Sequence, residues 1–396
     1  MTQLLSSRKV SAMRMACAVK RYGYKRARAT ANPDDRITYL YDAVGLTPAY
    51  TNLSTGEFVP GGWGSIIEEL CRPVMKLTGG GIDYELSRTD FTKKADGVTA
   101  SDVANTSYAG DCFIEFRKYI WVYRYSDATY DYVIFSNVQY DENYKAYACT
   151  DEDGNIQDSF LWGAFKGSNI SNKLRSLGTG SVMVNQTRNT EVSYAQANGD
   201  YYYTIYKSGW DFIGDWLTLI SKSDNGQTKF GRGRADTSSK SDCGTLKDKP
   251  MFWGSSVGTN DVKVFGIEGF WGNVFEGMAG LVYNGNIKTK MVPPYNFDGS
   301  GYNDTGLDPS GTSGGYVSTA QSYTDQGYVP QVASGSETQY YCDGLWYNNS
   351  QVNYGLVGGD WNSAGLDGPR CVYLWRLASA TGSFIGSRLS FVGPLE

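Results

Sequence analysis

The sequence predicts an α+β fold that is rich in β structure, with a twisted antiparallel sheet and few helices. Tyrosine, which favours strands, occurs 31 times among 396 residues, and glycine, which favours tight turns, occurs 48 times. Runs of aromatic and β-branched residues recur along the chain, whereas only one long segment has a clear helical period. No stretch reaches the roughly 18 apolar residues of a membrane helix, so we expect no insertion into a membrane.

The first predicted element is a basic arm, residues 1–35. Eight arginines and lysines and no acidic residue lie within residues 1–33, although the whole chain has a net charge of −5. A basic tail on an acidic body is typical of a docking arm for nucleic acid, an acidic protein surface or lipid headgroups. A solvated leader is an equal alternative, since termini are often disordered. A short helix fits residues 4–15 of this arm.

We expect residues 36–105 to form a small β-rich module. Strands are predicted at Ile37–Tyr41 and, after the glycine turn at Gly79–Gly81, at Ile82–Leu86. Between these strands, apolar residues at helical spacing predict a helix that is stopped by Pro73. The residues with this spacing are Trp63, Ile66, Ile67, Leu70 and Cys71.

The main domain is expected to span residues 106–396. Two β-prone runs, 113–125 and 130–135, predict a hairpin with a four-residue loop, and 201–206 predicts a further strand. Short strands in glycine-rich connections are predicted at 262–267, 281–283 and 288–292, followed by a long exposed loop at 298–315.

One segment of the main domain, residues 209–222, predicts a strong amphipathic helix. Ser208 and Asp211 resemble a capping box that opens the helix, and Asn225–Gly226 ends it. Its apolar residues recur at i, i+3, i+4 and i+7, which is the pattern of a face buried in the core. They are Ile213, Trp216, Leu217 and Ile220.

The absence of histidine from the chain excludes several kinds of chemistry. Neither a Ser-His-Asp or Cys-His nucleophile nor a histidine zinc site can be built. Mechanisms that use only carboxylates remain, glycoside hydrolysis above all. Asp298, Asp304 and Asp308 miss the spacing of a calcium-binding EF-hand, so a surface loop is the better interpretation. We expect no catalytic residue, no metal site and no cofactor.

The C-terminal segment has the composition of an adaptable recognition surface. Between residues 344 and 391, tyrosine, tryptophan, asparagine and arginine alternate with glycine, and such residues give contact area and flexible hydrogen bonding. Strand alternation at 372–376 places Tyr373 and Trp375 opposite the aliphatic side chains. A core position is the alternative for the tryptophans and the better one for Trp346. The expected binding residues are Tyr347, Asn353, Tyr354, Asp360, Trp361, Asn362, Tyr373, Trp375, Arg376 and Phe384.

Two parts of the sequence resemble a known fold family. Residues 262–268 and 270–276 are similar to the framework motif of formylglycine-generating-enzyme-like domains, a branch of the C-type lectin fold. That motif usually reads G-N-V-W-E-W, and here Phe275 and Gly277 replace both tryptophans. The terminal runs, at 344–351, 358–362 and 385–391, resemble the variable region of C-type-lectin-fold receptor-binding proteins of the major tropism determinant type, which diversity-generating retroelements diversify. Residues 37–48 and 90–104 also look like phage tail or fibre proteins from gut Firmicutes.

The resemblance implies a phage virion adhesin. A C-type-lectin-like domain at 106–396, with a variable-region-like segment at about 340–396, would bind a bacterial surface protein or glycan. Such relatives are usually homotrimers of the phage tail or fibre, made in the bacterial cytoplasm. The basic arm would attach the trimer to other virion proteins, with no specific nucleic acid as partner.

The cysteines bear on which branch of this family applies. Seven scattered cysteines without a CxxC motif favour reduced, mostly buried thiols. The enzymatic branch needs two nearby cysteines in its terminal segment, whereas here Cys371 stands alone and Cys342 lies 29 residues earlier. This departure favours a non-catalytic binding protein. The alternatives are a structural head or tail decoration protein and a glycan depolymerase that uses a carboxylate pair, which is disfavoured because no β-helix repeat is present.

Overall fold

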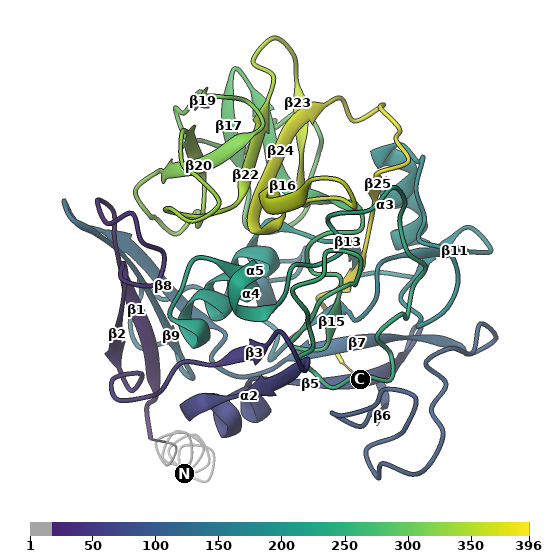
Figure 1. The fold of residues 1–396 in the computed structure, drawn as a ribbon. Coiled ribbons are helices and arrows are strands. Elements are labelled where there is room, and N and C mark those ends of the chain that lie inside the picture. Colours follow the sequence, from purple (N-terminus) through teal and green to yellow (C-terminus); the bar gives the residue numbers. More distant parts are fainter. Residues whose placement is uncertain (1–17, 396) are drawn as a thin grey trace, which may run out of the picture.

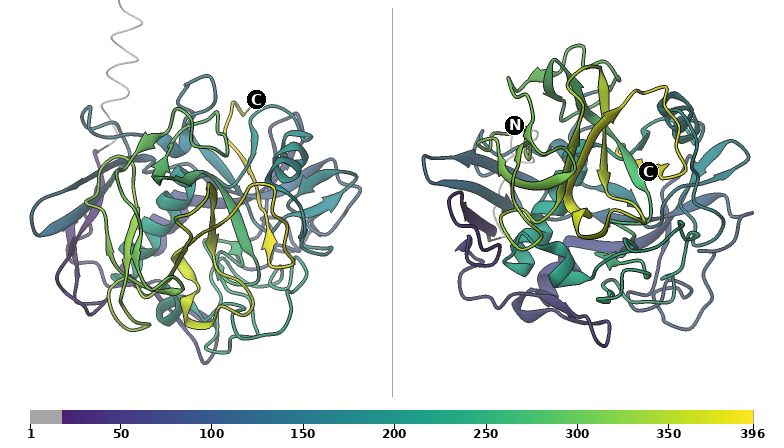
Figure 2. Two further views of the ribbon diagram at one scale, coloured as in Figure 1. Left: turned by 90° about the horizontal axis from the view of Figure 1, so that it is seen from above. Right: turned by 45° about the horizontal axis from the view of Figure 1, so that its top comes forward.

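Three sheets surround a central helix, α4 (Lys207–Ser221), in the computed structural model, which describes residues 18–395 (Figure 1). Seen from above, strands of the ten-stranded sheet pass in front of this helix (Figure 2). The fold is β-rich, as the sequence predicts. Within the described residues, every helix is too short or too polar to cross a bilayer. The helix expected at 4–15 lies outside the described residues.

The four-stranded sheet begins inside the expected basic arm. Its order is β2-β1-β9-β8, and all three pairings are antiparallel. The hairpin of β8 and β9 is confirmed, with Ser126 opposite Asp131. The expected first arm at 113–125 is wrong in its first half, because it is divided between β8 and β7 (Gly110–Phe116), which belongs to another sheet. The expected arm is wrong for its second half, because β1 is an inner strand paired on both sides. The strands are β1 (Arg21–Ala27), β2 (Ile37–Tyr41), β8 (Trp121–Ser126) and β9 (Tyr130–Ser136).

The six-stranded sheet crosses the expected domain boundary near residue 105. Its order is β13-β26-β10-β7-β5-β6, so strands of the expected N-terminal module pair with strands of the expected main domain. One hydrophobic core runs from Tyr22 to Val392. Residues on both sides of position 105 therefore share one core. The strands are β5 (Cys71–Leu77), β6 (Ile82–Glu85), β7 (Gly110–Phe116), β10 (Phe160–Gly163), β13 (Tyr202–Thr204) and β26 (Leu389–Phe391).

The ten-stranded sheet carries most of the C-terminal segment. Its main path is β18-β17-β16-β23-β24-β22-β20-β21-β19, and β25 pairs with β16. The sheet is mixed rather than purely antiparallel, because β22 and β24 run parallel. The strands are β16 (Phe275–Asn284), β17 (Asn286–Thr289), β18 (Asn303–Asp304), β19 (Ser310–Gly311), β20 (Gly315–Ala320), β21 (Pro330–Ala333), β22 (Gly344–Tyr347), β23 (Asn353–Gly358), β24 (Gly368–Arg376) and β25 (Ile385–Gly386).

Short elements complete the fold. The helix predicted before Pro73 ends earlier, at Leu70, because Pro73 itself lies within β5. The two-stranded ribbons are β3 (Tyr50–Asn52) with β4 (Glu57–Val59), β11 (Ser168–Ile170) with β12 (Lys173–Arg175), and β14 (Lys263–Val264) with β15 (Ile267–Glu268). The remaining helices are α2 (Gly64–Leu70), α3 (Arg188–Gln196) and α5 (Gly226–Phe230), with 3-10 turns η1 (Gly61–Trp63), η2 (Tyr147–Cys149) and η3 (Ala364–Leu366).

Helix α4 is buried along its whole length, which confirms the predicted core helix. Trp216 and Ile220 have no exposed surface, and the Trp216 ring stacks on Phe135 of β9 at 4.5 Å between centroids. The predicted capping box is wrong, since the helix begins at Lys207 without a side-chain cap. Asp211 instead accepts a hydrogen bond from Lys207 at 2.7 Å.

Buried ion pairs join the four-stranded sheet to the helices. Arg26, which the sequence placed in a solvated arm, is fully buried and donates two hydrogen bonds of 2.7 Å to Asp224. Asp215 of α4 accepts from Arg124 of β8 at 2.8 Å and from Arg370 of β24 at 2.5 Å. These pairs hold β8 and β24 against α4, and β1 against the segment that follows α4. The six cysteines among the described residues are all buried and unpaired, as the sequence predicts.

Candidate binding surface

The candidate surface lies on the face of the ten-stranded sheet that points away from the main core. Strand β24 has two different faces, as alternation predicts. Val372 and Leu374 are buried in the main core, whereas Tyr373 is half-buried and Trp375 is 42% exposed on the other side. The aliphatic face is therefore core, and the aromatic face is available for contact.

A β-bulge in β24 sets the directions of the side chains next to Trp375. Tyr373 is opposite Leu356 and Arg376 is opposite Tyr354. A step of three residues along β24 therefore matches a step of only two residues along β23. Cross-strand partners lie on the same face of a sheet, which places Arg376 on the same face as Tyr373. Trp375 falls within the bulge, and bulges commonly redirect a side chain in this way.

Three aromatic rings from distant segments gather around Phe275 of β16. The centroid of the Phe275 ring lies 5.7 Å from Trp346, 5.1 Å from Tyr373 and 6.4 Å from Phe384. We call Phe275, Trp346, Tyr373 and Phe384 the aromatic cluster. The first of these is almost fully buried and the other three are half-buried. The buried ring of Phe275 thus supports three partly accessible aromatic rings, and the exposed Trp375 follows Tyr373 by two residues in β24.

Arg376 adds a cation at the edge of this cluster. Its guanidinium carbon lies 5.2 Å from the centroid of the Phe384 ring. Its Nε atom is buried and has no hydrogen-bond partner among the described residues. Burial raises the pKa of Tyr373, partly offset by the nearby Arg376, so this hydroxyl stays protonated at neutral pH. At the edge of the cluster, Arg376 therefore has an Nε–H without an acceptor among the described residues, next to the neutral hydroxyl of Tyr373.

Two of the residues expected on the binding face are buried instead. Tyr354 is 1% exposed and packs with Phe275 beneath the cluster. Asn353 is fully buried, and its side-chain amide donates to the backbone carbonyls of Asn348 at 2.8 Å and Gln351 at 3.2 Å. Asn353 therefore closes a turn and Tyr354 supports the sheet, and neither is available for a receptor.

Four further expected residues are held by contacts outside the aromatic cluster. Asp360, Trp361 and Asn362 follow β23, where the backbone of Trp361 donates to the carbonyl of Asn273 and accepts from the N–H of Thr237. Burial raises the pKa of the Asp360 carboxyl there. Tyr347 points to the other side of the sheet, where its hydroxyl donates to the carbonyl of Gly311 at 2.7 Å. Of the expected set, Tyr373, Arg376 and Phe384 meet at the aromatic cluster, and Trp375 is the exposed chain neighbour of Arg376.

The sequence underrated two members of the cluster. Trp346 was assigned to the core because aliphatic and aromatic residues flank it, yet it is half-buried and its ring lies 5.7 Å from Tyr373. Phe275 was seen only as a substituted motif tryptophan. Trp346 and Tyr373 meet because β22 pairs with β24, and this parallel pairing joins residues 27 positions apart, such as Leu345 and Val372, without a local sequence signal.

The comparisons with known proteins are negative. No protein-family model matches this chain, and no curated protein matches it.

The acidic loop at 298–315 does not gather its carboxylates. Asp298 accepts from the backbone of Ser300, whereas Asp308 accepts from the Tyr283 hydroxyl at 3.0 Å. Asp304 accepts from the backbone of Gly306. Within residues 18–395, no three His, Cys, Asp or Glu side chains are placed to hold a metal ion.

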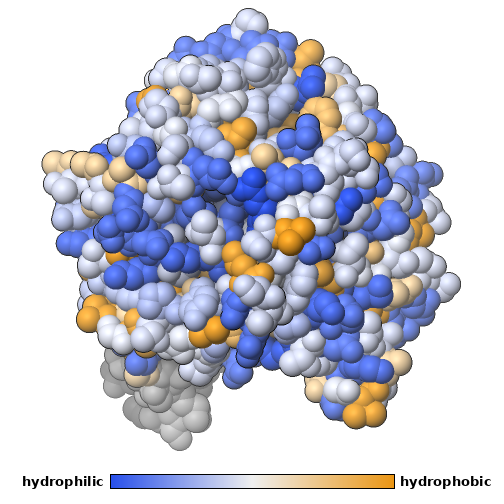
Figure 3. Space-filling model, viewed as in Figure 1, coloured by the Kyte–Doolittle hydropathy of each residue, from blue (hydrophilic) through white to orange (hydrophobic). Residues whose placement is uncertain are grey.

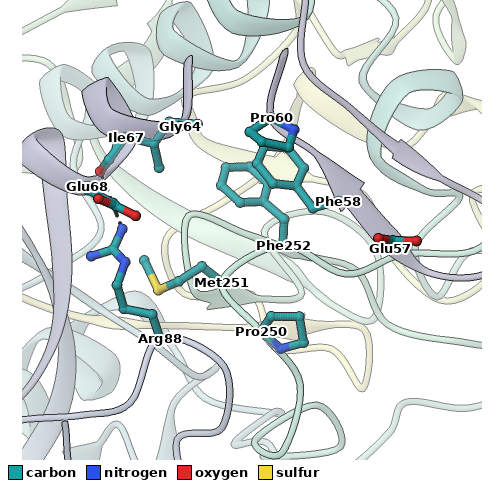
Figure 4. Close-up of a pocket in the computed structure, with 10 residues that line it drawn as sticks. All are labelled: Glu57, Phe58, Pro60, Gly64, Ile67, Glu68, Arg88, Pro250, Met251 and Phe252. Carbon is teal, nitrogen blue, oxygen red and sulfur yellow. Dashed lines mark hydrogen bonds between the residues drawn. The ribbon is translucent and has the colours of Figure 1, made fainter. Parts of the chain in front are cut away.

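An apolar pocket of about 350 Å³ lies between β4, α2 and residues 250–252 (Figure 4), and its lining includes no residue of the aromatic cluster. The rings of Phe58 and Phe252 stack at 4.0 Å on one side of it. Arg88 lies along another side, where it donates to the backbone carbonyls of Cys71 and Ile67. Because the Nη1 and Nη2 atoms of Arg88 already donate to these carbonyls, the pocket offers mainly apolar contact to a ligand.

The face of the molecule seen in Figure 3 shows no broad apolar patch that would be an alternative binding surface. That face is mostly hydrophilic, with hydrophobic residues in small separate spots. Scattered apolar residues are normal on a protein surface. The aromatic cluster with Trp375 and Arg376 is therefore the arrangement that most resembles a recognition surface.

Proposed function

We propose that this chain is a phage virion adhesin that binds a bacterial surface molecule through a non-catalytic domain of the C-type lectin fold. The observation that carries the proposal is the exposed Trp375 beside Arg376 at the edge of the aromatic cluster. Tryptophan, tyrosine and arginine supply most of the binding energy in protein recognition surfaces. All of these residues except Phe275 lie in the segment that resembles a variable region.

The contact between the two resembling segments supports this proposal. Glu276 ends the framework-like run, and Arg388 lies in the terminal run at 385–391. Arg388 donates to the Glu276 carboxylate at 2.7 Å, and Lys166 donates to it at 2.8 Å. All three side chains are buried. The framework-like run and the variable-like run therefore belong to one domain, as the resemblance requires.

The proposal includes a homotrimer with a diversified C-terminus, attached to the virion by its N-terminal end. These parts rest on the resemblance alone. Because β1 (Arg21–Ala27) belongs to the folded domain, we assign the attachment to the residues that precede this strand. Light scattering of the purified chain tests the trimer, and a mass of one subunit would contradict it.

Two single substitutions test the surface. Trp375→Ala and Arg376→Ala should each weaken binding of the labelled chain to susceptible Firmicutes cells by roughly 30-fold, which corresponds to about 2 kcal/mol for a central contact residue. Trp375 is exposed, so its truncation should leave the melting temperature nearly unchanged.

Tyr50→Ala is the matched control, since it removes a 45% exposed aromatic side chain from β3. It should bind cells like the unaltered chain. Normal binding by both test variants would contradict the proposed surface. Release of oligosaccharides from host polysaccharide would instead support the depolymerase alternative.

A further inference from the structure

A polar pocket of about 270 Å³ lies where the four-stranded sheet meets β20 and β21. The strands on either side can be followed at the left of Figure 1. The lining comes from segments far apart in the sequence and includes Arg28, Arg36, Asp131, Ser318, Gln331 and Tyr341. None of these residues belongs to the aromatic cluster or to the binding residues expected from the sequence.

Arg36 in this pocket is a buried cation with too few partners. It is 1% exposed, and its Nε atom donates to the carbonyl of Ala27 at 3.3 Å. Its Nη1 atom lies 3.5 Å from Asp224 without making a hydrogen bond and has no other partner among the described residues. Buried polar groups are nearly always paired, so this nitrogen is a vacant donor.

The charges around the pocket leave one positive charge in excess. Asp224 is already occupied by Arg26, which donates two hydrogen bonds of 2.7 Å to it. Arg28 donates to Asp131 at 2.9 and 2.7 Å. Three arginines thus face two aspartates, and Arg36 shares Asp224 with the more closely paired Arg26. A ligand with a single negative charge would complete the set.

The rest of the lining suits a hydroxylated ligand. Thr319 and Ser322 bring hydroxyl groups and Gln331 brings an amide group to the lining. Tyr341 covers one face of the Arg36 guanidinium at 4.7 Å, which leaves the guanidinium edge for a planar acceptor. Carboxylates match such an edge with two parallel hydrogen bonds. The volume lies at the lower end of ligand pockets, which is adequate for one sugar ring.

We propose that this pocket binds a carboxylate-bearing monosaccharide of the uronic acid class. The carboxylate pairs with Arg36, and the ring hydroxyls bind Thr319, Ser322 and Gln331. A uronic acid carries one negative charge at neutral pH, which equals the excess positive charge. The site goes beyond the proposed adhesin surface and does not depend on it.

Calorimetric titration of the full chain with free sugars tests this site without any host cell. Glucuronate should bind saturably, while glucose, acetate and inorganic phosphate should each bind at least about tenfold more weakly. Equal binding of acetate or phosphate would overturn the assignment to a sugar acid. Absence of saturation by glucuronate up to about 10 mM would overturn the site itself.

Variants separate the pocket from general effects on folding. Arg36→Gln should abolish glucuronate binding, but it also alters a buried ion pair. Gln331→Ala and the pocket-filling Ala320→Phe change half-buried positions, so they provide the second test and should weaken binding about tenfold or more. Gln139→Ala, an exposed glutamine outside the pocket, is the matched control. Unchanged affinity in Gln331→Ala and Ala320→Phe would contradict the proposal.

Discussion

Gly277 explains one departure from the framework motif at the level of a single residue. A side chain there would overlap the guanidinium of Arg188, which is fully buried. The tryptophan usual at this position of the motif therefore has no room in this chain. Arg188 pairs with Glu191 and lies over the ring of Tyr354 at 5.3 Å. The substitution thus accompanies a buried ion pair placed directly beneath the candidate surface.

That ion pair predicts a pH dependence of stability. Burial raises the pKa of Glu191 to about 7, although Arg188 partly opposes the shift. In the unfolded chain a glutamate titrates near 4.3. Between these values the folded state binds more protons than the unfolded state, so this group stabilises the fold at low pH and loses that effect as the pH rises through 7.

Glu191→Gln should remove this contribution. The free energy of unfolding of the variant, measured by urea denaturation at pH 5 to 8, should fall less between pH 5 and 7 than that of the unaltered chain. The comparison is made on slopes because the substitution also removes a partner of Arg188. Parallel pH profiles would contradict the raised pKa of Glu191.

The pair of Glu276 and Arg388 predicts a large loss of stability. Arg388→Ala leaves a buried carboxylate with Lys166 as its remaining cation, and breaking such a pair costs about 3–5 kcal/mol. Chemical denaturation measures the difference. Lys20→Ala is the control, since its ion pair with Asp42 is exposed and contributes at most about 1 kcal/mol. Similar small losses in both variants would show that Glu276 does not depend on Arg388.

At the residue level, sequence alone predicted the exposure of Trp375 but not the burial of Tyr354 or of several polar residues. Alternation gives the two faces of β24 as far as Leu374, and the bulge that follows has no signal in the sequence. Arg26 and Asn353 were expected at the surface because charged and amide side chains are usually exposed. Their burial depends on acceptors, Asp224 for Arg26 and nearby backbone carbonyls for Asn353. The position of those acceptors is fixed only by the folded chain.

At the level of elements, local patterns predicted those pieces whose partners are close in sequence. Helix α4 and the β8–β9 hairpin follow from helical spacing and from a four-residue turn. The pairing of β5 with β7, or of β22 with β24, has no such local signal. The sequence therefore indicated a minority of the strands and none of the sheets that they form, and it divided one core into two modules.

Trp216 provides the test for helix α4. Trp216→Ala should lower the free energy of unfolding by about 3–5 kcal/mol, because it empties a fully buried site. The ring contacts Phe135 and Trp63, so the cavity opens toward the four-stranded sheet. Thermal or urea denaturation measures the loss. A change below about 1 kcal/mol would mean that the neighbouring rings close the cavity.

For the whole molecule, the N-terminal strand decides which truncations are tolerated. The sequence predicted a basic arm over residues 1–35, but deletion of residues 1–33 takes away β1 and the buried Arg26. We expect the chain without residues 1–33 to lose cooperative thermal unfolding. Deletion of residues 1–17 should preserve it, since it leaves β1 and its pairs with β2 and β9. Cooperative melting of the longer deletion would contradict the central role of β1.

The buried pair of Arg26 and Asp224 also bears on how the chain is made. The two residues are 198 positions apart, and a ribosome adds roughly 5–20 residues per second. Arg26 therefore leaves the ribosome about 10–40 s before the carboxylate that neutralises it. During that interval Arg26, which is buried in the folded chain, lacks the carboxylate that it pairs with. We therefore expect co-translational chaperones to bind the nascent chain until Asp224 emerges.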